Sequence, residues 1–412
     1  MKKSRRFLMA IFAFMLPLAA AWAQNVVTNT TQNKSYATLQ DAFYEANQGD
    51  VLELLDDVDA TGETFGLDYN LGIEAGITLE GNNKTLTVNR RGISVARQSS
   101  NSRMMGAPAK APGNTIDVTI QNLTIKNVAA QVNGKGGRII NTRGGIGTLT
   151  LNNVTFDTQN TAYNREVRPL VIGGNQSTAA TVNITNCTFT NLTAPTGYNS
   201  IAINVLNPVV MNIQGTTINA QYVIHLGGAD ESYGSQGSKV TFNGRTVNAS
   251  AGAAVLFDAD NRGGANGSTV TLAGETKVTT PTADWYDLGN TENTIVWEHF
   301  ATNFISATKY ETKPTIQIAT VADLLALATL CNNALTSGQT AGNTYELVND
   351  LDLSSVDNWT PIGGSGMGSY PTISFKGTFD GKGHTISNRT CIDNTANYAT
   401  AGLFGSVMGA TI

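Results

Sequence analysis

A pattern of eight residues occurs six times between Val118 and Lys277, and it constrains the fold more than any other feature. Each copy has apolar residues at positions 1 and 3, threonine or asparagine at position 2, asparagine or glycine at position 5, and threonine at position 7. The copies are VTIQNLTI, LTLNNVTF, VNITNCTF, MNIQGTTI, VTFNGRTV and VTLAGETK, and their starts lie 29 to 33 residues apart. A fixed period of this length with strand-type alternation is typical of a β-solenoid.

The alternation places positions 1 and 3 on a buried face and position 2 on the outer face of each strand. Asparagine and glycine are the residues that best tolerate positive φ, so each coil is expected to turn a corner at position 5. Position 5 is occupied by Asn122, Asn153, Asn186, Gly215, Gly244 and Gly274. The threonines at position 7, from Thr124 to Thr276, are expected to stack as a ladder with a spacing of about 4.8 Å along the solenoid axis.

A third apolar segment lies between most copies, which predicts three strands per coil. These segments are Ile139-Ile140, Leu170–Ile172, Ile201–Ile203, Tyr222–Ile224 and Ala254–Leu256. With this pattern, residues 36–280 resemble the pectin-lyase-like superfamily of right-handed parallel β-helices. The resemblance implies an all-β fold, and it implies no single activity, because the fold carries lyases, hydrolases, adhesins and stalks.

The sequence at the N-terminus predicts that the protein is exported. Residues 1–23 have a basic start, an apolar run and a small-residue sequence before Gln24, so they resemble a signal peptide cleaved near Ala23. The mature chain is expected to be secreted or attached to the cell surface, with no transmembrane segment. Thr38 followed by Asp41 favours a short helix near 38–47 that covers the N-terminal end of the solenoid in residues 24–280.

The opening of the first solenoid recurs late in the chain. Thr320 with Asp323 again fits a helix start, YELVNDLDL (345–353) matches VLELLDDVD (51–59), and FDGKGHTI matches LEGNNKTL. Residues 315–412 are therefore expected to begin a second β-helix, after an aromatic-rich cap or linker at 281–314. Its tail resembles the GLUG-type repeat of bacterial surface adhesins, and because no capping segment follows it, the chain is expected to be a piece of a longer protein.

Charge is unevenly distributed in a chain whose formal net charge is −5. Between Gly81 and Phe156 the sequence has ten basic residues and one acidic residue, Asp117. Part of this basic segment is either a solvated loop or a contact for an anionic partner, such as an acidic glycan of the cell envelope or of a host. The candidate ligand-binding residues are Arg90, Arg91, Arg97, Arg103, Lys110, Lys135, Arg138 and Arg143. Nucleic acid is not an expected partner of an exported acidic protein.

Three cysteines are an odd number for an exported chain. Cys187 occupies repeat position 6, where other copies have Leu123 and Val154, so it is expected to be a buried apolar residue. Cys331 and Cys391 could form a disulfide, since both lie in the second predicted domain.

The remaining candidate chemistry lies in the turns that follow the third strands. Asp258 and Asp260 supply hard oxygen ligands that suit Ca²⁺, and no other cofactor is predicted. The superfamily resemblance implies that a lyase would add a basic residue such as Arg262, and His225 is a further candidate base. Against this interpretation, these are ordinary polar turn residues, and the chain lacks the common motifs of nucleophile, zinc-protease and phosphate-loop enzymes.

The sequence therefore favours an exported, non-catalytic adhesin or glycan-binding scaffold. The alternatives are a polysaccharide lyase or glycoside hydrolase that acts on an acidic polysaccharide, and a structural spacer that presents another domain.

Overall fold

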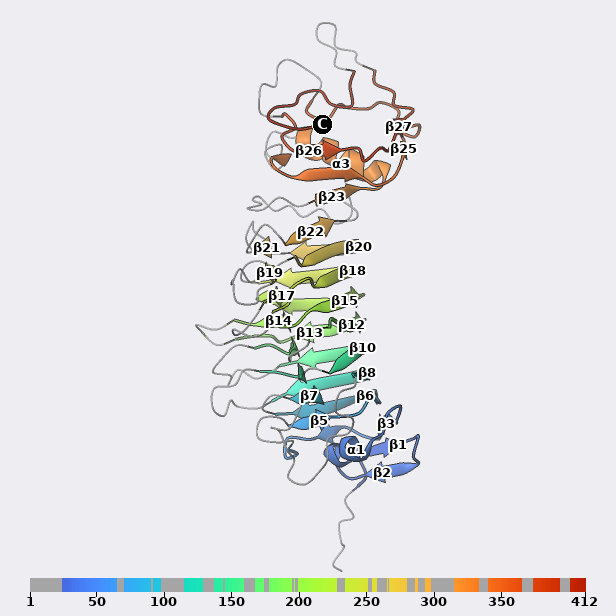
Figure 1. Cartoon of the computed structure of the whole chain (residues 1–412), viewed down its shortest axis with the longest axis vertical. Helices are drawn as coiled ribbons and strands as arrows, with labels where there is room; N and C mark the ends of the chain where they lie inside the picture. The colour runs from blue at the N-terminus through green and yellow to red at the C-terminus, as the bar shows by residue number, and fades with distance from the viewer. Residues whose placement is uncertain are drawn as a thin grey trace, which may run out of the picture.

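The computed structural model describes residues 24–64, 70–89, 92–97, 115–128, 137–143, 145–158, 167–173, 178–194, 196, 199–227, 234–250, 254–257, 265, 267–279, 286–287, 293–297, 315–332, 340–364, 373–392 and 401–412. Strands make up 50% of the described residues, and they form a parallel β-solenoid of about seven turns. Figure 1 shows the coils stacked in a column, with the N-terminal elements at one end and the C-terminal elements at the other. The predicted parallel β-helix is confirmed.

One sheet, called the large sheet below, contains most of the strands in the described residues and runs along the column. Its strands are β1 (Val27–Asn29), β2 (Lys34–Tyr36), β3 (Val51–Leu54), β4 (Val58–Asp59), β6 (Thr78–Val88), β8 (Ile116–Asn127), β10 (Ile146–Asp157), β12 (Ala180–Thr185), β13 (Thr188–Thr190), β15 (Val209–Gln214), β16 (Thr217–Ala220), β18 (Lys239–Ala249), β20 (Thr269–Thr279), β22 (Thr294–Trp297), β23 (Thr315–Ile318), β24 (Thr344–Leu347) and β26 (Thr378–Asp380). From β3 onward every described pairing in this sheet between successive coils is parallel.

The third apolar segments form a second parallel sheet, called the small sheet, as the sequence predicted. Its strands are β5 (Leu71–Ile73), β7 (Ile93–Arg97), β9 (Ile140–Arg143), β11 (Leu170–Ile172), β14 (Ile201–Val205), β17 (Tyr222–Leu226), β19 (Val255–Phe257) and β21 (Tyr286–Asp287). A two-stranded sheet of β25 (Leu351–Asp352) and β27 (Ile386–Ser387) follows near the C-terminus.

The corners lie where the repeat places them. Asn122, Asn153 and Asn186 have φ values of 53°, 53° and 52°, and Gly215 and Gly244 have 56° and 76°. These left-handed residues turn the chain between the two halves of each repeat, for example inside β8 and β10. The predicted corner is therefore confirmed at these five positions.

In the first four copies, repeat positions 1, 3, 6 and 8 fill the interior of the column. Phe156 and Phe189 occupy position 8 of successive copies, and their rings stack with centroids 4.4 Å apart and an interplanar angle of 2°. Cys187 is 1% exposed, which confirms that it is a buried core residue. In-register stacking thus converts the sequence repeat into columns of identical or similar side chains.

The N-terminal end of the column is covered by α1 (Leu39–Glu45) and by the hairpin of β1 and β2. The predicted cap is confirmed, because the Thr38 hydroxyl accepts the Asp41 N–H at 3.1 Å and α1 packs against β5. β1 pairs antiparallel with both β2 and β3, so the direction of the sheet reverses at this end.

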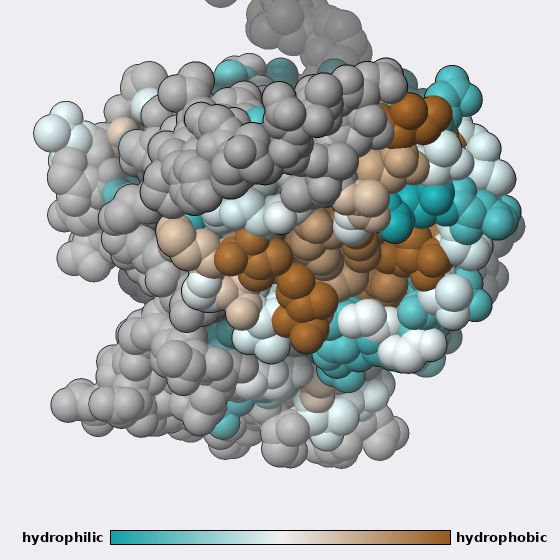
Figure 2. Space-filling view, turned by 90° about the horizontal axis from the view of Figure 1, so that it is seen from above, coloured by the Kyte–Doolittle hydropathy of each residue, from teal (hydrophilic) through white to brown (hydrophobic). Residues whose placement is uncertain are grey.

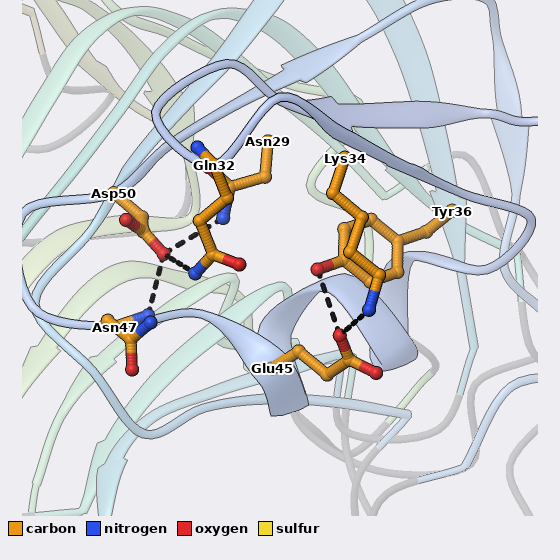
Figure 3. A network of polar contacts seen from close by, with 7 residues as sticks. All are labelled: Asn29, Gln32, Lys34, Tyr36, Glu45, Asn47 and Asp50. Carbon is orange, nitrogen blue, oxygen red and sulfur yellow. Dashed lines mark hydrogen bonds and ion pairs between the residues drawn. The ribbon is translucent and has the colours of Figure 1, made fainter.

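Two carboxylates hold this cap together (Figure 3). Asp50 Oδ2 accepts hydrogen bonds from Asn29 Nδ2 at 2.8 Å, from Gln32 Nε2 at 2.6 Å and from the Asn47 N–H at 2.7 Å. Asp50 is 4% exposed, so these donors replace the water that its charge would otherwise need.

The second carboxylate belongs to Glu45, the last residue of α1. It accepts a hydrogen bond from the Tyr36 hydroxyl at 3.1 Å and forms an ion pair with Lys34 Nζ, which lies over the Tyr36 ring (Figure 3). These contacts tie the helix to strand β2 and therefore keep the N-terminal end of the solenoid closed.

Residues 315–412 continue the column. β23 pairs in parallel with β22 before it and with β24 after it. The helix α3 (Val321–Asn332) lies between β23 and β24 in the sequence. The predicted second helix start is confirmed, because the Thr320 hydroxyl accepts the Asp323 N–H at 3.2 Å and Asp323 Oδ2 accepts the Thr320 N–H at 2.9 Å. This region therefore repeats the local structure of the N-terminal cap while its strands extend the large sheet.

The last coil stacks on the one before it through three parallel bridges, at Phe404, Val407 and Thr411. The ring of Phe404 contacts those of Phe375 and Phe379, with centroid distances of 5.2 Å and 5.3 Å. Aromatic packing thus fills the interior at this end of the column.

Candidate functional site

The position-7 threonines form a ladder on the outer surface of the large sheet. Thr85, Thr124, Thr155, Thr188 and Thr217 are register partners in successive coils, and we call this set the threonine ladder. All five threonine side chains are half-buried. Parallel stacking repeats the hydroxyl and methyl groups at about 4.8 Å.

The sixth copy does not continue this ladder, so that part of the expectation was wrong. The register shifts between Asn243 and Arg245, which places Thr276 opposite Arg245 and Lys277 opposite Thr246. Thr276 is fully buried, and its hydroxyl donates to the carbonyl oxygens of Ala273 at 2.7 Å and Phe242 at 3.0 Å. The extra residue at the corner turns this threonine inward.

A second polar column follows repeat position 2 and runs almost the full length of the large sheet. Its members are in register from coil to coil, with Val296 as the one apolar member from Thr78 onward. They are Thr78, Thr119, Thr150, Asn183, Asn212, Thr241, Thr271, Val296, Thr315, Thr344, Thr378 and Thr411. Asn212 Nδ2 donates to Asn183 Oδ1 at 3.1 Å, so the two amides in this long column are linked.

Amide groups also stack along the corner. Asn153 Nδ2 donates to Asn122 Oδ1 at 3.0 Å, and Asn122 Nδ2 donates to Glu80 Oε2 at the same distance. The Glu80 carboxylate takes a further hydrogen bond from Gln121 Nε2 at 2.9 Å. The sequence analysis did not identify this amide stack as a unit, although the asparagines at position 5 contained the signal.

Gly215 forms the corner that follows Asn186, and its neighbour leaves no room for a side chain. A Cβ atom at Gly215 would lie 2.5 Å from Asn186 Oδ1, so the amide of the preceding corner occupies the space that a side chain would need. Two features therefore favour glycine at this corner: the backbone φ is positive, and Asn186 occupies the space of a Cβ atom.

Most of the basic candidate residues lie outside the described part of the chain. These are Arg90, Arg91, Arg103, Lys110 and Lys135. Arg97 in β7 and Arg143 in β9 are backbone register partners, and their side chains are also outside the description. Arg138 is half-buried and donates from Nη1 to Asn141 Oδ1 at 3.3 Å, so it lies against the small sheet.

His225 lies in β17 and faces the neighbouring strand β14. Its Nδ1 atom lies 2.9 Å from Asn204 Oδ1, and these two residues are register partners. Asn204 is fully buried, and its Nδ2 atom has no hydrogen-bond partner. The sequence analysis missed Asn204 because these two strand positions are only 21 residues apart, which is shorter than the repeat.

The other candidate catalytic and calcium-binding residues, Asp258, Asp260 and Arg262, lie outside the described residues. The strands that lead to them are described. Leu226, at the end of β17, pairs with Phe257, at the end of β19, so the segments after these strands leave from adjacent rungs of the small sheet.

All three cysteines are thiols, and no disulfide joins Cys331 to Cys391. Burial raises the pKa of Cys187 to about 11 and that of Cys331 to about 11. Both thiols are therefore protonated at neutral pH, which makes them poor nucleophiles.

In the described ranges, no three His, Cys, Asp or Glu side chains are grouped closely enough to hold a metal ion. Nor is any helix of the described residues long and apolar enough to cross a membrane.

Comparisons with protein-family models, with curated proteins and with solved structures found no significant match.

Proposed function

We propose that this chain is an exported, cell-surface scaffold that binds glycans without catalysis. The observation that carries the proposal is the pair of in-register polar columns, the threonine ladder and the long column, on the outer face of one continuous sheet. Threonine hydroxyls and asparagine amides can donate to and accept from sugar hydroxyls, while threonine methyl groups contact the apolar faces of the rings.

The geometry suits a repetitive ligand. A rigid stack offers the same donor and acceptor set on each coil, so a polymer that lies along the column can contact several rungs at once. Many weak contacts on one preorganised surface then add without a large ordering cost. The excess of basic residues between Gly81 and Phe156 in the sequence favours an acidic glycan, since opposite charges attract.

Replacement of ladder hydroxyls tests the proposal. Valine matches the shape and strand preference of threonine, so a Thr124→Val, Thr155→Val, Thr188→Val triple variant should keep the fold. We expect it to bind the preferred glycan at least tenfold more weakly in a panel of polyuronates and neutral polysaccharides. Thr329→Val, on the exposed side of α3, is the matched control and should bind normally.

Salt dependence identifies the kind of glycan. Binding of an acidic polymer should weaken as ionic strength rises, whereas binding through hydroxyls alone should not. If no glycan in the panel binds at low salt, or if the triple variant binds as well as the unmodified chain, the proposal fails.

A lyase or hydrolase is the second candidate, and the register of β17 with β19 is the observation that favours it. Leu226 and Phe257 pair at the ends of these strands, and His225 directly precedes Leu226. Incubation with polyuronates, followed by ultraviolet absorbance of unsaturated products and by a reducing-sugar assay, tests this candidate. Turnover that is lost in Asp258→Asn and Arg262→Ala would establish it in place of the scaffold.

A further inference from the structure

A hollow lies beside the long column in the C-terminal coils. Its volume is about 550 Å³, which is within the usual range for sites that bind small ligands. Its lining includes three neighbouring members of the long column, Thr344, Thr378 and Thr411. Lys376 also lines it, and we call it the lysine hollow.

The lysine hollow belongs to the polar outer surface of these coils. In the view from above, most brown apolar atoms gather near the middle, and teal and white atoms lie around them on the right-hand and lower sides (Figure 2). Thr344 and Thr378 each precede a buried aromatic residue, Tyr345 and Phe379. Strand alternation therefore turns the two threonines outward, toward a molecule that lies along the column.

Glycines in the coils before and after Lys376 make room for the hollow. Lys376 lies two residues before Thr378 of the long column. Gly342 and Gly409 lie two residues before the long column in the preceding and the following coil, and both line the hollow. Because glycine has no side chain, the space that stacked side chains would fill stays open around the lysine.

Lys239 has the same place in an earlier coil but different neighbours. It too lies two residues before the long column, in β18, and its register partners in the adjacent coils are Val210 and Thr269. Lys239 is exposed, whereas Lys376 is half-buried. The two lysines thus share a position relative to the long column and differ in their surroundings.

Lys376 also brings a charge that no carboxylate balances. The acidic register partners Glu346 and Asp380 both lie 3.0 Å from the ammonium group of a different lysine, Lys382. In the part of the chain that the structure describes, Lys376 itself forms no ion pair. A half-buried ammonium group has lost part of its hydration, so an anion in the hollow should interact with it more strongly than with an exposed lysine.

We propose that the lysine hollow binds an anionic substituent of a glycan, either a carboxylate or a sulfate ester. Lys376 supplies the positive charge, and the three threonines supply hydroxyl groups for the sugar that carries the anion. This inference rests on the proposed glycan binding along the long column, and it adds one charged anchoring point to that surface.

Short oligosaccharides test the hollow apart from the rest of the column. Ligand-detected NMR titration of the full chain compares a galacturonate disaccharide, a sulfated disaccharide and a neutral galactose disaccharide. We expect an acidic disaccharide to bind more tightly than the neutral one, and the tighter of the two acids identifies the anion. Lys376→Gln should weaken that binding by about tenfold or more, because it removes a charge-assisted hydrogen bond. Lys376→Arg keeps the charge and should retain most of the affinity.

Lys239→Gln is the matched control, and it should bind the acidic disaccharide like the unmodified chain. Thermal unfolding checks that each variant keeps its fold. The inference fails if neither acidic disaccharide binds more tightly than the neutral one, if Lys376→Gln has no effect, or if both glutamine variants weaken binding equally.

Long polysaccharides separate this failure from that of the proposed function. Polymer binding that depends on the threonine ladder but survives Lys376→Gln would contradict the lysine hollow alone. Absence of binding by every long polysaccharide would contradict the proposed function.

Discussion

The Asp350 carboxylate accepts the backbone N–H of Thr385, which lies one coil further along the chain, at 2.8 Å. In the N-terminal cap, Asp57 accepts the N–H of Thr85 in the same way, at 2.7 Å. These positions coincide when residues 345–353 are aligned with residues 52–60, one residue beyond the match seen in the sequence, so the internal similarity extends to single hydrogen bonds. Each aspartate holds the turn of the next coil against its own strand.

Other contacts repeat in the same way. Asp59 accepts the Thr61 N–H and Asp352 accepts the Ser354 N–H, both at 2.9 Å. The chain therefore uses one local module twice, first as a closed end and then within the column. The difference lies in strand direction, because β1 pairs antiparallel with β3 whereas β23 pairs parallel with β24.

Acid should destabilise the C-terminal module through Asp350. The Thr385 N–H and then the His384 side chain hold the pKa of Asp350 below its ordinary value of 3.8. This stabilisation is complete above the ordinary pKa and is lost as the pH falls through the lower pKa of the folded state. We expect Asp350→Asn to lower the midpoint of thermal unfolding at neutral pH and to reduce its further fall below about pH 4.

Asp357→Asn is the control for this experiment, because Asp357 is an exposed aspartate of the same module. Its acid sensitivity should match that of the unmodified chain. An Asp350→Asn variant with the unmodified pH profile would show that this carboxylate does not support the turn.

The left-handed corner should penalise alanine at Asn153. Its φ of 53° strains a residue with a Cβ atom, and its amide donates to Asn122 at 3.0 Å. We expect Asn153→Ala to reduce the free energy of unfolding by about 1–2 kcal/mol, measured by urea denaturation. Asn153→Gly removes the same amide without the strain and should cost less than about 1 kcal/mol. Equal losses in the two variants would contradict the conformational explanation.

The stacked phenylalanines should be essential to the interior. Phe189 is fully buried and lies parallel to Phe156, so Phe189→Ala leaves a cavity between two coils. We expect a loss of about 3–5 kcal/mol in the free energy of unfolding, measured by denaturant titration. Phe189→Leu refills most of the space and should lose less than half as much. A small effect of alanine would mean that the coils collapse around the gap.

Thiol labelling should distinguish the three cysteines by their reactivity. Burial protects Cys187 and Cys331 and raises the pKa of both thiols to about 11, so neither should react with a thiol reagent in the native chain. Cys391 is only partly buried, and it should be labelled first. Denaturation should then expose two more thiols, whereas a single reactive thiol after unfolding would indicate a disulfide.

The solenoid and its corners could be predicted because the signals are local. Alternation at positions 1 and 3 predicts strands, and Asn or Gly at position 5 predicts a left-handed turn, in each copy independently. The two helix starts at Thr38 and Thr320 were predictable for the same reason, since a capping box involves residues only three apart.

The candidate site was less predictable, because it depends on which residues of different coils lie opposite each other. His225 meets Asn204 across a spacing of 21 residues, and one extra corner residue buries Thr276 although its repeat copy looks regular. Neither contact follows from the eight-residue pattern, because loop length and bulges set the register between coils.

The sequence by itself thus determined a parallel solenoid with asparagine corners and threonine ladders, since period and backbone preference act within a few residues. The tertiary structure decided where each ladder ends and which carboxylates close the N-terminal cap. These features depend on packing between coils about 30 residues apart, and only the assembled stack brings those residues into contact.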